Sequence, residues 1–91
     1  MNEKQFLADF LARTQRLREE RGFTQQDMAE ALEVPLATYA KWERRSPIRH
    51  AYVFRFCGIV GCEIHYLFTG RHRAKPEIVG LRDHLQKHSR K

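Results

Sequence analysis

Residues 24–43 constrain the fold of this chain more than any other segment. Thr24 followed by Asp27 is a capping-box-like start of a helix. Apolar residues then recur at helical spacing, as expected of one buried face: Met28, Ala29 and Leu32. Residues 33–34 form the turn, and Pro35 stands at a helix start, where its missing N–H is not needed. The segment therefore predicts two short helices joined by a tight turn.

The second of these helices, about residues 35–43, has two unlike faces. With about 100° between successive residues, Tyr39, Trp42 and Glu43 fall on one side. The opposite side carries small residues, one leucine and one cation: Leu36, Ala37, Ala40 and Lys41. A helix with aromatic residues inward and this face outward can approach a partner closely. The segment has the layout of a helix-turn-helix, whose second helix lies in the major groove of DNA.

The rest of the chain up to residue 70 predicts three more helices. The first spans about residues 3–21 and ends at Gly22; another starts at residue 48 or 49, runs to residue 60 and ends at Gly61; a short one covers residues 63–68. Their expected inward apolar residues are Phe6, Leu7, Phe10, Leu11, Thr14 and Leu17; Val53, Phe54, Phe56, Cys57 and Val60; and Ile64, Leu67 and Phe68. We therefore expect residues 1–70 to form one compact, all-α domain of five helices with an extended first helix.

The first helix is longer than a small core requires. The early apolar stripe of this helix consists of Phe6, Leu7, Phe10 and Leu11. These side chains must be covered either by their own domain or by a second subunit. This stripe is one candidate dimer surface, and the surface around residues 63–68 is another. A third is a candidate sixth helix that opens at Pro76 and carries Ile78, Leu81 and Leu85 on one stripe.

Positive charge is concentrated in two parts of the chain. The net charge is +6, with −2 in residues 1–40, +4 in residues 41–55, −1 in residues 56–70 and +5 in residues 71–91. A polyanion is the natural partner of such a distribution. For residues 71–91, a basic C-terminal extension, a solubilising surface is an equally good interpretation.

Other classes of function have little support in the sequence. No apolar run approaches the ~20 residues that span a bilayer, and the first residues lack a signal-peptide pattern, so a cytoplasmic protein is expected. No Ser–His–acid set, paired carboxylates or phosphate loop stands out, so neither an enzyme nor a cofactor is expected.

A zinc site is disfavoured as well. Its four candidate ligands are Cys57, Cys62, His84 and His88. Twenty-one residues separate Cys62 from His84, whereas a Cys2His2 finger has about twelve there. Two buried or half-buried thiols in a reducing compartment are the simpler interpretation.

Several short motifs occur in a characteristic order: Arg18–Gln25, Met28–Ala29, Val34, Trp42–Arg44 and the run Ile59–Gly70. In order and spacing they resemble the lambda-repressor/Cro (XRE) family of helix-turn-helix regulators, over about residues 13–70. The resemblance implies a five-helix bundle that binds operator DNA, usually as a homodimer, and regulates transcription.

The resemblance also implies residue roles. The base-facing positions are Leu36, Ala37, Ala40 and Lys41. Lys41 can donate to guanine O6 or N7, while Leu36 and Ala37 offer only apolar contact, for example to a thymine methyl group. Partial core packing is an alternative role for Leu36.

Phosphate contacts are implied for Gln25, Thr38, Arg44, Arg45, Arg49 and His50. Gln25 is also expected to prop the recognition helix, and Arg45 stands where the family often has glycine. Arg18 and Glu43 match positions that form a structural salt bridge, and an inward carboxylate without such a partner would be costly. Glu33 replaces a common glycine in the turn, at a cost of roughly 1 kcal/mol if the backbone there is left-handed, and Glu63 stands where a serine or aspartate cap is usual.

These observations favour a sequence-specific, double-stranded DNA-binding regulator, repressor-like and of phage or prophage type. Two alternatives remain open. One is a protein-interaction or dimerisation module built on the same scaffold, and the other is the antitoxin of a toxin–antitoxin pair with a protein partner.

Overall fold

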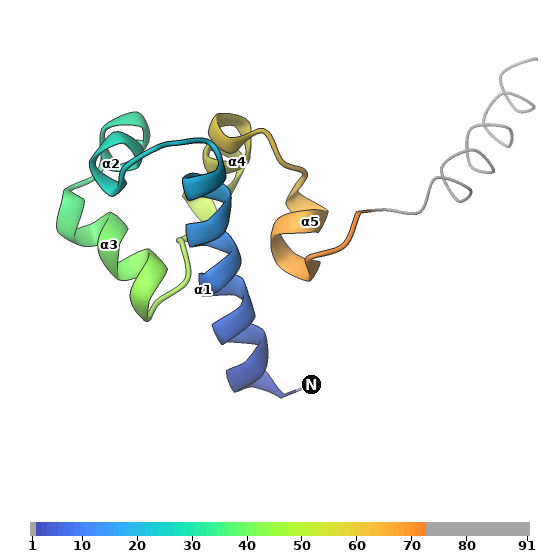
Figure 1. The fold of residues 1–91 in the computed structure, drawn as a ribbon. Coiled ribbons are helices and arrows are strands. Elements are labelled where there is room, and N and C mark those ends of the chain that lie inside the picture. Colours follow the sequence, from blue (N-terminus) through green and yellow to red (C-terminus); the bar gives the residue numbers. More distant parts are fainter. Residues whose placement is uncertain (1, 73–91) are drawn as a thin grey trace, which may run out of the picture.

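The computed structural model describes residues 2–72. Within this range the chain forms five helices and no strand: α1 Glu3–Glu20, α2 Gln25–Leu32, α3 Leu36–Arg44, α4 His50–Val60 and α5 Ile64–Thr69 (Figure 1). The predicted all-α fold is confirmed. The candidate sixth helix and residues 73–91 of the basic extension lie outside the described residues.

Helix α1 runs through the middle of the fold, as Figure 1 shows, with α2 and α3 on one side and α5 on the other. Helix α4 contacts both α2 and α5 and so closes the bundle. The Asn2 side chain caps α1 by accepting from the Gln5 backbone N–H at 2.8 Å, and Gly22, with φ of +77°, follows its last turn. These local signals explain why α1 has the predicted length.

The core takes side chains from every helix. Its buried apolar residues are Phe10, Leu17, Met28, Ala29, Leu32, Tyr39, Trp42, Ile48, Val53, Phe56, Cys57, Val60 and Leu67. The predicted inward set was wrong at Phe54, which is 79% exposed, and at Phe6, Ile64 and Phe68, which are 45%, 44% and 37% exposed. In α4 the inward stripe has the i, i+3, i+4, i+7 spacing that starts at Val53, and Phe54 lies about 100° away from it.

The early stripe of α1 does not form a single surface. Phe10 is 2% exposed, and its ring lies 5.0 Å from that of Phe68 in α5. Leu7 and Leu11 are half-buried, and Phe6 remains 45% exposed. Phe10 therefore belongs to the core of its own domain and offers no surface to a second subunit.

The turn between α2 and α3 contains a non-glycine residue in the left-handed region. Glu33 has φ of 59° and ψ of 45° and is the C-cap of α2. Pro35 is the N-cap of α3, not its first residue as predicted, because its extended ψ of 148° lets its carbonyl accept from the backbone N–H groups of Thr38 and Tyr39. Helix α3 is thereby displaced by one residue from the expected range.

Replacing Glu33 with glycine is expected to raise the free energy of unfolding by about 0.5–1 kcal/mol, because relief of the left-handed strain exceeds the extra entropy of the unfolded chain. Urea denaturation measures this. Glu33→Ala is the matched control: it removes the exposed 3.7 Å ion pair with Arg55 but keeps the Cβ atom. Equal stability of the two variants would contradict the strain argument.

The two cysteines meet at the end of α4. The backbone N–H groups of Gly61 and Cys62 both donate to the Cys57 carbonyl, at 2.8 and 3.0 Å, an arrangement that brings the side chains of residues 57 and 62 together. Both thiols are free, and burial raises the pKa of Cys57 to about 12. Residues 2–72 contain no group of three side chains suited to a metal ion, and His84 and His88 lie outside them. No helix among residues 2–72 has the length and apolarity needed to cross a bilayer.

Candidate nucleic-acid interface

Helix α3 is held to the domain by its inner face. Tyr39 is fully buried and Trp42 is 3% exposed, and their rings meet edge to face with centroids 6.3 Å apart. The Trp42 ring also lies 5.2 Å from that of Tyr52 in α4. These aromatic contacts fix the rotation of α3 about its own axis, and with it the direction of the outer face.

Glu43 is the centre of a buried hydrogen-bond network. Arg18 Nε donates to Oε2 at 2.7 Å and Arg18 Nη2 to Oε1 at 3.1 Å. Gln25 Nε2 donates to Oε1 at 3.0 Å, and the Tyr39 hydroxyl donates to Oε2. The Glu43 side chain is 3% exposed, and its carboxylate joins α1, α2 and α3 at one point. We call Arg18, Gln25, Tyr39 and Glu43 the Glu43 network.

The hydrogen bonds of this network favour the ionised forms of the Glu43 carboxylate and the Arg18 guanidinium group. Burial alone would raise the pKa of Glu43, but the hydrogen bonds it accepts, foremost that from Arg18, hold the pKa below its usual 4.5. The hydrogen bond to Glu43 raises the pKa of Arg18, and burial raises that of Tyr39. The bidentate pairing compensates both buried charges.

Arg18 also orders the connection before the motif. Its Nη1 donates to the Phe23 carbonyl at 2.6 Å, immediately ahead of the Thr24 cap of α2. The Thr24 and Asp27 side chains complete a capping box with bonds of 3.0 and 2.9 Å. A single arginine thus positions the first helix of the motif as well as the second.

The outer face of α3 is open. Leu36 is 44% exposed, Ala37 and Lys41 are exposed, and Thr38 and Ala40 are half-buried. Lys41 forms no ion pair within residues 2–72. The structure thus keeps Leu36 out of the core, the alternative role considered for it, and leaves the lysine ammonium available to a partner.

A basic run continues from the end of α3 to the start of α4. Arg44, Arg45, Arg49 and His50 are all exposed, and none of them forms an ion pair within residues 2–72. Arg45 has φ of −149°, outside the left-handed region, so this turn does not need the glycine that the family often has. The backbone N–H groups of Arg45 and Ser46 both donate to the Lys41 carbonyl, which fixes the direction of the run.

The structure adds one residue that sequence reasoning missed. Tyr39 was predicted only as core packing, whereas its hydroxyl is a donor in the Glu43 network. Its i, i+4 spacing from Glu43, on the same inner face, is the sequence signal that could have revealed this.

A family model described as helix-turn-helix matches residues 15–67, more than half of the chain. Searches of curated proteins and of solved structures gave no match.

Proposed function

This chain belongs to the lambda-repressor-like (XRE) family of DNA-binding helix-turn-helix regulators, and from this we propose that it is a sequence-specific, repressor-like regulator of phage or prophage type. Its recognition helix is α3, which lies in the major groove of double-stranded DNA. The observation that carries the proposal is the combination of an open outer face with a rigid, buried inner face on one nine-residue helix. Its site of action is the nucleoid.

Base readout is assigned to the outer face of α3: Leu36, Ala37, Ala40 and Lys41. Lys41 is the one long hydrogen-bond donor of this set and reads guanine. The two apolar side chains at positions 36 and 37 contact a thymine methyl group. Specificity then rests on Lys41, on apolar contact and on the shape of the DNA.

Phosphate contacts are assigned to the residues around this face: Gln25, Thr38, Arg44, Arg45, Arg49 and His50. The support is that the four basic residues are exposed and lack ion pairs within residues 2–72. Gln25 has a second role, because its hydrogen bond to Glu43 ties the start of α2 to α3. The basic extension, residues 71–91, adds sequence-independent attraction to DNA.

Lys41→Ala is expected to weaken the preference for one base at the DNA position that Lys41 contacts. Loss of the lysine–guanine contact removes about 1–3 kcal/mol of discrimination there. Selection of DNA from a random pool, performed with wild type and Lys41→Ala, measures this. Arg44→Ala is the matched control, which weakens binding to all sequences alike, and identical selected motifs for wild type and Lys41→Ala would contradict the assignment.

We further propose that the chain binds DNA as a homodimer, with recognition helices about 34 Å apart. Of the candidate surfaces, the one around α5 has the strongest support. Phe54 is 79% exposed and lines, with Ile64, a hollow of about 360 Å³ between α4 and α5. An exposed apolar patch of this kind marks a protein–protein contact.

Phe54→Glu is therefore expected to convert the dimer to a monomer, because it places a charge in an apolar interface. Sedimentation equilibrium measures the mass. Phe6→Glu is the control on a second candidate surface, the early stripe of α1, and leaves the dimer intact. Dissociation by Phe6→Glu alone would assign the interface to α1 instead.

One alternative function has an observation in its favour. Leu36 exposes 44% of its surface on the face assigned to DNA, as a protein-interaction module on this scaffold would require. The basic run from Arg44 to His50 favours DNA instead. A gel-shift titration at two salt concentrations separates the two, since an interaction module shows no steep, salt-dependent affinity for DNA.

A further inference from the structure

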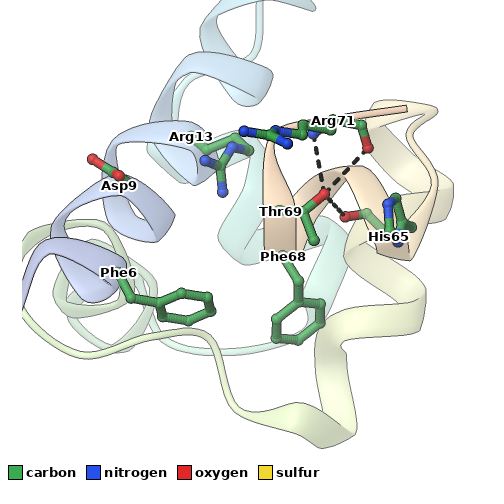
Figure 2. Close-up of a pocket in the computed structure, with 7 residues that line it drawn as sticks. All are labelled: Phe6, Asp9, Arg13, His65, Phe68, Thr69 and Arg71. Atoms are coloured by element: carbon green, nitrogen blue, oxygen red, sulfur yellow. Dashed lines mark hydrogen bonds between the residues drawn. The ribbon is translucent and has the colours of Figure 1, made fainter. Parts of the chain in front are cut away.

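A pocket of about 440 Å³ lies between the first half of α1 and the end of α5 (Figure 2). Helix α5, which forms one wall of the pocket, lies on the opposite side of α1 from α3 (Figure 1). The pocket includes none of the residues to which base or phosphate contacts are assigned, although Arg71 is the first residue of the basic extension. Its volume is within the range of small-molecule sites in proteins, about 300–1,000 Å³. The pocket is therefore large enough for a compact organic ligand.

The apolar part of the pocket consists of two phenylalanine rings. Phe6 from α1 and Phe68 from α5 are 45% and 37% exposed, and both line this pocket and a second, apolar hollow of about 280 Å³ beside it. The buried Phe10 ring packs against both, with centroids 6.4 and 5.0 Å away. This support keeps the two exposed rings in place as walls for an apolar ligand.

The polar part of the pocket is cationic. Arg13 extends from α1 to the end of α5, where its Nη1 donates to the Leu67 carbonyl at 2.9 Å. Gly70 leaves room for this guanidinium group, since a Cβ atom there would lie 2.6 Å from Arg13 Nη2. The buried Nε of Arg13 has no hydrogen-bond partner within residues 2–72, and no carboxylate in that range forms an ion pair with Arg13.

Arg71 supplies a second guanidinium group. The Thr69 hydroxyl accepts from the Arg71 backbone N–H at 3.1 Å and donates to the His65 carbonyl at 2.8 Å, which fixes the chain after α5. Figure 2 shows the Arg71 side chain directed toward Arg13, with the two phenylalanine rings on the other side of the pocket. Arg71 likewise has no ion pair within residues 2–72.

One carboxylate also lines the pocket. Asp9 accepts a hydrogen bond from Gln5 Nε2 at 2.8 Å, and it offsets only one of the two guanidinium charges. The pocket therefore combines an excess of positive charge with an aromatic wall. The segment that follows in the sequence, residues 72–91, has a net charge of +4 and is a poor electrostatic match for it.

We propose that this pocket binds a small aromatic carboxylate, with the carboxylate between Arg13 and Arg71 and the ring between Phe6 and Phe68. Arginine pairs with carboxylates through two parallel hydrogen bonds, and a ring between two phenylalanines gains aromatic contact. The proposal does not rest on base readout by α3, because the pocket shares no residue with that helix. It gives the domain a site for an anionic effector.

The test uses 1-naphthoate as the probe, titrated into the full chain and followed by NMR chemical shifts and calorimetry. We expect saturable shifts centred on residues around Phe6, Phe68 and Arg71. The uncharged 1-naphthalenemethanol is expected to bind at least tenfold more weakly, and 1-naphthylmethylamine more weakly still, because only the carboxylate pairs with arginine. Equal affinity for the acid and the alcohol would overturn the proposal, as would the absence of saturable shifts in the pocket.

A pair of variants locates the site. Arg71→Gln is expected to lower the affinity for 1-naphthoate at least tenfold. The fold should be unaffected, because the Arg71 side chain makes no hydrogen bond to residues 2–72. Arg16→Gln removes an exposed arginine of α1 that does not line the pocket, and it should leave the affinity unchanged. If both variants have the same effect, the probe binds through general charge and the pocket assignment is wrong.

Discussion

Glu43→Ala is expected to lower the free energy of unfolding by about 3–5 kcal/mol, the usual cost of breaking a buried ion pair from one side. The substitution removes the bidentate partner of the buried Arg18 guanidinium, which then has the 3.8 Å ion pair with the exposed Glu19 in its place. It also removes the acceptor of the Gln25 and Tyr39 hydrogen bonds. Urea denaturation followed by circular dichroism measures the loss. For a domain of this size, such a change takes away a large part of the total stability.

Glu30→Ala is the matched control, since within residues 2–72 the side chain of this exposed α2 glutamate pairs with Gln26 alone. Its loss should change the free energy of unfolding by no more than about 0.5 kcal/mol. Acid titration gives an independent check. The folded-state pKa of Glu43 lies below the unfolded value of 4.5, so its stabilisation is complete above that pH and disappears as the pH falls through the folded pKa. A Glu43→Gln variant should lack this acid-sensitive component, and an unchanged pH profile would contradict the role of the carboxylate.

DNA affinity is expected to fall about a thousandfold between 50 and 200 mM salt. Arg44, Arg45 and Arg49 give about six phosphate contacts in a dimer, and each contributes about 0.9 to the slope of log affinity against log salt. Gel-shift titration across this salt range measures the slope.

Single substitutions test which residues contribute to that slope. Arg44→Ala should lower it by about 1.8, since a dimer loses two contacts. Arg16→Ala removes an exposed arginine of α1 outside the assigned interface and should change little. A slope that is equally reduced in both variants would mean that net charge, not the basic run, governs the affinity.

Local sequence signals predicted the helices and the two faces of α3 well. Tyr39, Trp42 and Glu43 are buried, and on the opposite side of α3 Leu36, Ala37 and Lys41 are exposed, as the 100° spacing indicated. The reason is that a short amphipathic helix buries one stripe of residues, and the spacing of these residues can be seen within a single segment of the chain. The left-handed backbone at Glu33 was considered only because this residue stands where the resembling family often has glycine.

The apolar character of a residue predicted its burial less well where two large apolar side chains lie close together in the sequence. Val53 and Phe54 are neighbours in α4, yet only Val53 is buried. Phe10 packs against α5, while Phe6, one turn earlier, is nearly half exposed. Which of two nearby apolar residues is covered depends on where other helices end, and this information is distributed over the whole chain.

The sequence by itself determined the five helices, the turn between α2 and α3, and the family, because capping residues, helical spacing and ordered motifs act over short distances along the chain. Only the tertiary structure decided how Glu43 collects donors from three helices, and how Arg13 reaches the Leu67 carbonyl 54 residues away. It also brought Phe6 and Phe68 to the same pocket. Such contacts between distant residues follow from the packing angles of the helices, which no local pattern specifies.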